Sequence, residues 1–420
     1  MENAVASQAA VLVSIAKDTS QMRQCAESLE ELERLLETAG GEKFATLVQV
    51  KQAFDPATCI GKGKLEELSD LCKNNGIHLA IFDFELSPSQ IRNLEDAMED
   101  VQVIDRSMLI LDIFALHAVS GEGKLQVELA QLKYTAPRLT GRGTELSRLG
   151  GTIGTRGPGE TKLETDRRHI RRRIVALEEQ IREMAKNRAT MRAGRDRSGI
   201  PQVAIVGYTN AGKSTLLNRL TDAGVLSEDK LFATLDPTTR KYTLPEGDQI
   251  LLTDTVGFIR NLPHHLVKAF RSTLDEAVFA DVLVLMADAS DESCADQIEV
   301  TRETLAHLGA DNKPCITVYN KADLLENADH IVPEDLENSV FVSAATGEGI
   351  DKFLGMLQEK IRQNSKKVKM RFSYSEQSAA NGVYSFGTVE SFEYLEDGIE
   401  VVAVMEAHGL GKYQKYIVEE

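Results

Sequence analysis

One glycine-containing octapeptide constrains this chain more than any other stretch, and it reads Gly207-Tyr208-Thr209-Asn210-Ala211-Gly212-Lys213-Ser214. It follows the apolar run 203–206 and leads into the leucine-containing run 215–220, so we place it between a buried strand and the start of a helix. In that context the glycines allow successive N–H groups to surround phosphate oxygens, and the helix N-terminus attracts the same anion. The pattern therefore predicts a phosphate-binding loop rather than a glycine-rich turn without a ligand.

Two side chains of this loop have expected roles in a nucleotide site. The Lys213 ammonium is expected to reach the β- and γ-phosphates, and the Ser214 hydroxyl is expected to bind Mg²⁺. Thr215, the next residue, is included among the expected nucleotide contacts. A phosphate loop does not specify the base, so the base has to be inferred from motifs further along the chain.

Three later strand-end motifs indicate a guanine nucleotide. The apolar run 251–254 ends in Asp254-Thr255-Val256-Gly257, which places a carboxylate near the metal and an N–H near the γ-phosphate. Asn320-Lys321-Ala322-Asp323 supplies a carboxylate acceptor, which suits the paired N1–H and 2-amino donors of guanine and not adenine. Ser343-Ala344-Ala345 follows another strand, and a backbone N–H of this turn can meet the guanine carbonyl oxygen.

A hydroxyl-rich loop lies between the first two motifs. It contains Phe232-Ala233-Thr234-Leu235-Asp236 and continues through Pro237 to Thr239. Such a loop can be ordered by Mg²⁺ and the γ-phosphate and released after hydrolysis. The hydroxyls of Thr234, Thr238 and Thr239 are each able to bind the metal, and their spacing does not choose among them. An ordinary turn around Pro237 is the alternative interpretation.

Length and charge set broader limits on the chain. Its 420 residues predict about three domains of ~150 residues each. The net charge of −17 argues against a protein that coats nucleic acid with its whole surface, although it allows a local basic patch. The five cysteines show no metal-ligand spacing, and we find no signal peptide and no apolar run long enough to span a membrane. We therefore expect a cytoplasmic protein in a reducing compartment.

Residues 1–119 alternate between strand-like and helix-like periods, which predicts an N-terminal α/β domain. The β-α-β-α order implies a small parallel sheet with crossover helices. The expected strands are 10–15, 44–50, 77–82 and 101–104, and the expected helices are 20–39, 63–74, 87–98 and 106–118. Gly61-Lys-Gly-Lys64 is expected to open a helix. We interpret it as a surface turn in preference to a binding site for an anion or a nucleic acid backbone.

Residues 120–199 are predicted to form a basic helical hairpin with a long loop. From residue 133 to residue 197 there are 17 lysines and arginines against 8 acidic residues, a net charge of +9. Leucines at positions 125, 129 and 132 mark one helix face, and apolar residues at 170, 174, 177, 181, 184 and 191 mark another. Two such seams most simply bury each other in an antiparallel pair of helices.

The segment 137–161 between these helices contains seven glycines, and a loop of this length usually has a function. Arginines in a flexible, hydroxyl-rich chain can fit against phosphates, so we predict RNA contact in preference to a merely solvated basic face. The predicted RNA-binding residues are Arg138, Arg142, Arg148, Arg156, Arg167, Arg168, Arg171 and Arg172.

The remaining chain completes the expected fold class, which is multidomain α/β. A P-loop GTPase domain is expected at 200–365, and a small antiparallel β-rich domain at 366–420. The strands expected in this last domain are 368–374, 383–386, 389–394, 399–404 and 413–418, with hairpin turns at 381–382 and 397–398.

These motifs, and above all the runs Gly123–Lys133 and Gly154–Asp166, resemble HflX-type GTPases over residues ~10 to 365. The resemblance implies a bacterial translational GTPase that binds the large ribosomal subunit and splits ribosomes stalled under stress, acting as a monomer on the ribosome. The hairpin loop would reach toward the peptidyl-transferase region. It also implies that Thr234 is the switch ligand to Mg²⁺ beside Ser214. Family members have been credited with ATP binding through the N-terminal domain, and this sequence shows no second phosphate loop for it.

The expected catalytic groups are Lys213, Thr234 and Gly257, which position the γ-phosphate and neutralise its charge. In Ras-like enzymes a glutamine follows Asp-x-x-Gly, but here Phe258 does, and it cannot hydrogen-bond to water. We therefore predict slow hydrolysis alone and stimulation by the ribosome on the order of 10²-fold or more. Two alternatives are a GTP-dependent assembly factor for the large subunit that does not split ribosomes, and a nucleotide-gated scaffold or P-loop kinase. The Asn320–Asp323 motif disfavours the kinase.

Overall fold

The structure is a computed structural model, and it divides the chain into two compact units. The first comprises residues 1–183, 228–236 and 260–271, and the second comprises 184–227, 237–259 and 272–420. Each unit is described separately. The described residues are 8–138, 158–196, 200–221, 231–232, 235–260, 271–325, 333, 335–363 and 365–419.

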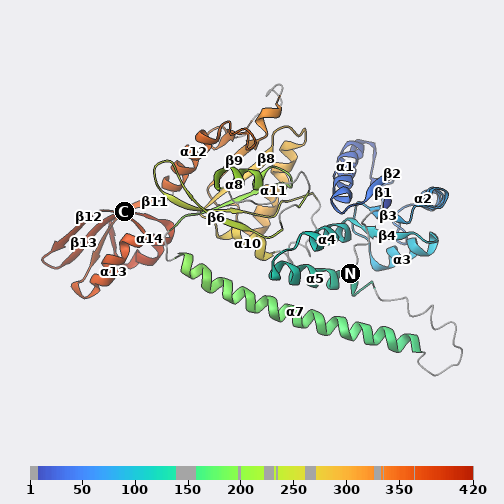
Figure 1. The fold of residues 1–420 in the computed structure, drawn as a ribbon, viewed down its shortest axis with the longest axis horizontal. Coiled ribbons are helices and arrows are strands. Elements are labelled where there is room, and N and C mark those ends of the chain that lie inside the picture. Colours follow the sequence, from blue (N-terminus) through green and yellow to red (C-terminus); the bar gives the residue numbers. More distant parts are fainter. Residues whose placement is uncertain are drawn as a thin grey trace. The chain divides into compact units, whose positions relative to one another are not determined.

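The first unit contains a parallel four-stranded sheet in the order β2-β1-β3-β4 (Figure 1). The strands are β1 (Ala9–Ala16), β2 (Glu42–Val50), β3 (Leu79–Phe82) and β4 (Gln102–Asp105). The helices are α1 (Met22–Thr38), α2 (Lys62–Asn75), α3 (Pro88–Ala97) and α4 (Arg106–His117). All four residues of β3 are buried, as expected for a central strand covered on both faces. The predicted parallel sheet and its element order are confirmed, and Gly61 caps the start of α2.

Two helices of the basic region pack through the predicted apolar seams. They are α5 (Gly121–Thr135) and α7 (Pro158–Asp196). The buried leucines at positions 129, 132 and 177 form a cluster with partly buried residues at 125, 170, 174 and 181. Arg173 also pairs with Glu128 at 2.6 Å, but both side chains are half-exposed, so the apolar seam dominates the stability of this contact.

The second unit contains a six-stranded sheet in the order β10-β9-β8-β5-β7-β6. The strands are β5 (Gln202–Gly207), β6 (Thr238–Thr243), β7 (Gln249–Asp254), β8 (Val282–Asp288), β9 (Cys315–Asn320) and β10 (Ser339–Phe341). Only β6 is antiparallel to its neighbour. The helices are α8 (Lys213–Thr221), α10 (Arg271–Phe279), α11 (Cys294–Leu308) and α12 (Ile350–Gln363). The carboxyl ends of β5, β7, β9 and β10 carry the four predicted nucleotide motifs at one edge of the sheet, where ligands of such folds bind.

The C-terminal residues form a four-stranded antiparallel sheet in the order β12-β13-β11-β14. The strands are β11 (Ser365–Phe372), β12 (Gly387–Leu395), β13 (Gly398–Glu406) and β14 (Ile417–Glu419), with helices α13 (Gln377–Gly382) and α14 (Ala407–Tyr413). The fold class is thereby confirmed, including this antiparallel sheet.

Three details of the C-terminal prediction are corrected. Residues 383–385 form a 3₁₀ helix instead of a strand, and the expected turn at 381–382 lies within α13. The last expected strand shortens to β14 behind a 3₁₀ turn at 414–416. The apolar residues Ala380, Val383 and Phe386 recur every three positions and all enter the core, a period that fits helical turns. The hairpin turn before Gly398 is confirmed.

Candidate nucleotide-binding site

The phosphate-binding loop joins β5 to α8, and two of its glycines make very close backbone approaches. Gly207 has φ 151° and Gly212 has φ 94°, a region that L side chains rarely adopt. A Cβ atom at Gly207 would lie 2.1 Å from the Met286 carbonyl oxygen, and one at Gly212 would lie 2.1 Å from the Asn320 amide nitrogen. Only glycine therefore fits at either position, and the loop can curve tightly before α8 begins.

Lys213 is the buried cation of this loop. Its Nζ donates hydrogen bonds to the carbonyl oxygens of Gly207 at 3.2 Å and Tyr208 at 2.7 Å. Burial lowers the pKa of the Lys213 ammonium to about 8, and the charge of Asp254 opposes this shift only in part. A phosphate anion beside Nζ would favour the charged form and raise this pKa again.

Ser214 and Asp254 come together from α8 and the end of β7. The Ser214 hydroxyl donates to the Asp254 carboxylate at 2.6 Å, and Asp254 is fully buried. A hydroxyl and a carboxylate oxygen are the hard ligands that Mg²⁺ prefers, so these two residues fit a magnesium ion next to the phosphates. Among the described residues, no cluster of three or more histidine, cysteine, aspartate or glutamate side chains could hold a metal elsewhere.

Asn320 connects the phosphate loop to the predicted base-binding turn. Its amide nitrogen donates to the Ala211 carbonyl at 2.8 Å, and its amide oxygen accepts from the Ala344 N–H at 2.9 Å. Asp323 is exposed, so its carboxylate is accessible to a base. Lys321 lies in the left-handed backbone region and pairs with Asp288 at 2.6 Å.

In the turn after β10, two of the three backbone N–H groups already have partners within the fold. This limits which N–H can donate a hydrogen bond to the guanine carbonyl oxygen. The Ser343 N–H already donates to the Glu348 carbonyl at 2.9 Å, and the Ala344 N–H is bound by Asn320. Of the three residues predicted here, Ala345 therefore supplies the candidate N–H. Arg219 of α8 donates to the Ala345 carbonyl at 3.3 Å and holds this turn in place.

Backbone pairing ties the segment after β7 to the phosphate loop, a contact that the motifs alone do not reveal. The Phe258 N–H donates to the Gly207 carbonyl at 3.0 Å, and the Thr209 N–H donates to the Phe258 carbonyl at 2.8 Å. A Cβ atom at Gly257 would lie 2.7 Å from the Thr209 Cα and 3.0 Å from the Lys213 Nζ. The Phe258 ring is buried, in keeping with its inability to orient water.

The Thr255 hydroxyl forms a hydrogen bond within the sheet of the second unit. Its hydroxyl donates to the Ile205 carbonyl at 2.7 Å, and the side chain is fully buried. Thr255 thus fixes β7 beside β5. In β6, the Thr239 hydroxyl lies 2.9 Å from the Thr253 hydroxyl, which gives Thr239 a partner in the sheet.

Phe232, Leu235 and Asp236 of the hydroxyl-rich loop belong to the first unit, whereas its last residues, 237–239, belong to the second. Phe232 contacts the Phe114 ring of α4 edge-on, with a centroid distance of 4.7 Å. The Asp236 carboxylate accepts from the N–H groups of Ser120 at 2.7 Å and Val119 at 3.0 Å, where α5 begins. Leu235 is buried. Ala233 and Thr234 lie outside the described residues. Ser120 is the N-cap of α5, and its hydroxyl accepts from the Gly123 N–H at 2.8 Å, so Asp236 holds the segment just before the helix, a role that the motif did not predict.

Arg260, three residues after Gly257, is another residue that sequence reasoning missed. Its guanidinium pairs with Glu27 of α1 at 2.9 Å. This hydrogen bond lowers the pKa of the Glu27 carboxyl. The two residues are 233 positions apart, so no local pattern could indicate the pair.

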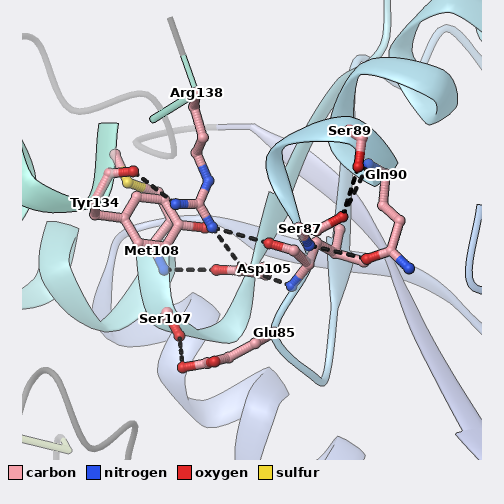
Figure 2. Close-up of polar contacts among 10 residues, drawn as sticks. Glu85, Ser87, Ser89, Gln90, Asp105, Ser107, Met108, Tyr134 and Arg138 are labelled. Carbon is pink, nitrogen blue, oxygen red and sulfur yellow. Dashed lines mark hydrogen bonds and ion pairs between the residues drawn. The ribbon is translucent and has the colours of Figure 1, made fainter. Parts of the chain in front are cut away.

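Arg138, predicted to contact RNA, has internal partners at the end of α5 (Figure 2). Its guanidinium donates to the carbonyl oxygens of Tyr134 at 2.6 Å and Leu86 at 2.9 Å, and lies 3.5 Å from the Asp105 carboxylate. It also stacks on the Tyr134 ring, 3.3 Å from the centroid. These contacts give Arg138 a role in the fold, and its RNA contact stays a prediction.

The other predicted RNA-binding residues fall into two groups. Arg168, Arg171 and Arg172 are exposed on α7, and Arg167 is partly exposed. Arg142, Arg148 and Arg156 lie outside the described residues. In the part of the chain that the structure describes, no helix is long and apolar enough to cross a membrane.

Comparisons with known proteins show which proteins this chain resembles. Residues 26–115 match the family model described as GTP-binding GTPase N-terminal, 117–195 match GTP-binding GTPase Middle Region, and 202–321 match 50S ribosome-binding GTPase. GTPase HflX of Lacrimispora saccharolytica is 48% identical over 392 residues, which cover 93% of this chain and 92% of that protein. GTPase HflX of Escherichia coli is 43% identical and covers 89% of this chain and 88% of that protein. A crystal structure of the SsGBP and GDP complex is 25% identical with a TM-score of 0.47, covering 85% of this chain and 99% of that one.

Proposed function

This chain belongs to the HflX family of GTPases, and from that premise we propose that it binds the large ribosomal subunit and dissociates stalled or stressed ribosomes. The observation that carries the proposal is the match of residues 202–321 to a 50S ribosome-binding GTPase. The chain also supplies a basic region, with exposed arginines on α7 that suit phosphate contact. Such a factor would work in the cytoplasm.

We assign the nucleotide contacts as follows. Lys213 and the loop amides hold the β- and γ-phosphates, Asp323 accepts from guanine N1–H and the 2-amino group, and the Ala345 N–H donates to the guanine carbonyl. Ser214 would hold Mg²⁺, with Asp254 hydrogen-bonded behind it at 2.6 Å and Thr234 as the ligand that the family resemblance implies. When bound, the ion neutralises charge on the transferred phosphate. The full proposed contact set is Gly207, Tyr208, Thr209, Asn210, Ala211, Gly212, Lys213, Ser214, Thr215, Phe232, Ala233, Thr234, Leu235, Asp236, Asp254, Thr255, Val256, Gly257, Asn320, Lys321, Ala322, Asp323, Ser343, Ala344 and Ala345.

Hydrolysis by the chain alone is proposed to be slow. The Gly257 N–H is placed to sense the γ-phosphate, but the next side chain, Phe258, is buried and apolar and cannot orient a water molecule. A partner must therefore supply or order the group that does so. The ribosome is the proposed partner, and we expect it to raise turnover on the order of 10²-fold or more.

Sucrose-gradient profiles test the splitting activity. Intact 70S ribosomes incubated with the protein and a non-hydrolysable GTP analogue should separate into subunits, with the protein in the 50S fraction, while GDP should leave the ribosomes intact. Binding to 50S particles without separation of 70S ribosomes would favour the alternative, a large-subunit assembly factor. Absence of the protein from every ribosomal fraction at low salt would contradict both.

A further inference from the structure

The C-terminal sheet exposes a row of aromatic rings, which we call the tyrosine face: Tyr374, Tyr384, Phe392 and Tyr394. The three tyrosines are 51%, 61% and 59% exposed, high values for large rings. Tyr384 stacks on Phe392 with a centroid distance of 6.1 Å, and Phe392 contacts Tyr394 at 5.6 Å. Phe392 and Tyr394 are two residues apart on β12, so they project from the same side of the strand. Tyr384, Phe392 and Tyr394 therefore form one continuous surface, and Tyr374 is joined to the end of β12 through its hydroxyl.

The tyrosine face is held in place before any partner binds. The Gln377 amide donates to the Tyr394 hydroxyl at 3.2 Å, and the Tyr374 hydroxyl donates to the Leu395 carbonyl. Phe392 packs against the C-terminal core. Rings that are already ordered lose little conformational entropy on binding, and exposed tyrosines are enriched where proteins contact each other. The surface also lies on β12, an edge strand of its sheet.

Charge indicates what this surface can bind. Residues 373–397 contain five acidic residues and no lysine, arginine or histidine. Glu396 and Asp397 are exposed in the turn directly after β12, and Glu376 follows Tyr374. Two of the five carboxylates are engaged: Glu376 accepts from Tyr416 at 2.9 Å, with Lys415 at 3.8 Å, and Glu390 pairs with Lys367 at 2.5 Å.

These features favour a basic protein segment over nucleic acid. Aromatic platforms for single-stranded RNA combine stacking with a cationic groove, and here the local charge would repel phosphates. An arginine or lysine side chain, in contrast, is attracted to the face of an exposed aromatic ring and can pair with the neighbouring carboxylates. We propose that the tyrosine face binds a lysine- and arginine-rich segment of a protein partner. If the chain acts on ribosomes, as proposed above, this partner is a basic protein of the particle and not its RNA.

A direct binding experiment tests the inference without ribosomes. The full chain is titrated against a fluorescent arginine- and lysine-rich dodecapeptide and against a fluorescent oligouridylate, with anisotropy as the readout at 150 mM salt. The double variant Tyr384→Ser/Tyr394→Ser should bind the peptide at least tenfold more weakly, and Tyr384→Phe/Tyr394→Phe should keep most of the affinity. Because both tyrosines are exposed, the serine variant is expected to keep the thermal midpoint of the wild type.

A matched variant controls for the general acidity of the chain. Glu299 and Glu303 are exposed on α11, so Glu299→Lys/Glu303→Lys makes the same charge change as Glu396→Lys/Asp397→Lys, away from the tyrosines. Glu299→Lys/Glu303→Lys should weaken peptide binding less than twofold, and Glu396→Lys/Asp397→Lys should weaken it at least tenfold. Equal losses in the two variants, or an unchanged affinity in the serine variant, would overturn the inference. So would a loss of oligouridylate binding in the serine variant.

A photo-crosslinker at position 384 extends the test to ribosomes. In complexes with large subunits, the crosslinked product should be sensitive to protease and not to ribonuclease, and a ribonuclease-sensitive product would overturn the inference. If the chain fails to sediment with subunits, the proposed function is refuted, and the peptide titration still decides the role of the tyrosine face.

Discussion

The pKa of Lys213 predicts that nucleotide affinity falls as the pH rises through about 8. The ammonium is buried, with 6% of the residue exposed, and burial lowers its pKa in the free protein. Bound phosphates favour the charged form, so the complex requires a proton that the free protein loses above pH 8. The nucleotide affinity is therefore highest at pH values below this pKa and declines at pH values above it. From pH 7 to pH 9 the dissociation constant should rise about tenfold, equivalent to about 1.4 kcal/mol.

The assay is a titration with a fluorescent GTP analogue in constant Mg²⁺ and ionic strength, repeated from pH 6.5 to pH 9. Lys213→Arg is the control, because guanidinium stays charged throughout and guanine's own titration affects both proteins equally. The arginine variant should show weaker binding with little added pH dependence. A wild-type affinity that is flat across this range, or that falls in parallel with the arginine variant, would refute the assignment of Lys213 as the titrating group.

Three further predictions concern other parts of the site. Asp323→Asn should shift preference from GTP toward xanthosine triphosphate, because an amide donor replaces one carboxylate acceptor; competition binding measures this, and retained GTP preference would contradict the role of Asp323. Asn320→Ala leaves the Ala211 carbonyl and the Ala344 N–H without their partner. It should lower the free energy of unfolding, measured by urea denaturation, by about 1–3 kcal/mol, and it should also weaken nucleotide binding. Asp236→Ala removes the acceptor of the Val119 and Ser120 N–H groups just before α5 and should cost about 1 kcal/mol of unfolding free energy, whereas Asp397→Ala in the exposed turn after β12 should be neutral; equal urea midpoints for the two variants would argue against this role of Asp236.

Local motifs were enough to predict which strands and helices carry the nucleotide site. A phosphate loop depends on glycines at two backbone positions and on the adjacent strand and helix, all within a few residues, so the geometry at Gly207 and Gly212 follows from neighbouring sequence. The N-terminal sheet was predicted for a similar reason, since the switch between period 2 and period 3.6 is local. At residues 383–386 the same approach failed because a short apolar run fits a strand or a helical turn equally well.

Contacts between distant residues could not be predicted from these patterns. Asn320 was predicted only as part of a nucleotide motif, and the structure shows its amide joining Ala211 to Ala344. Asp236 accepts from the N–H of Ser120, 116 residues earlier in the chain, and the Arg138 guanidinium lies over the Tyr134 ring. Nothing in the residues around these side chains specifies such partners.

The sequence by itself determined that the chain carries a phosphate loop, a guanine-type carboxylate and a basic helical region, because each depends on residue types at short spacing. Tertiary structure alone decided which polar groups are still accessible for ligands and which are used by the fold. Hydrogen bonding is saturable: once the Ala344 N–H has a partner within the fold, it is no longer available to a ligand, and only the folded arrangement shows which groups are taken.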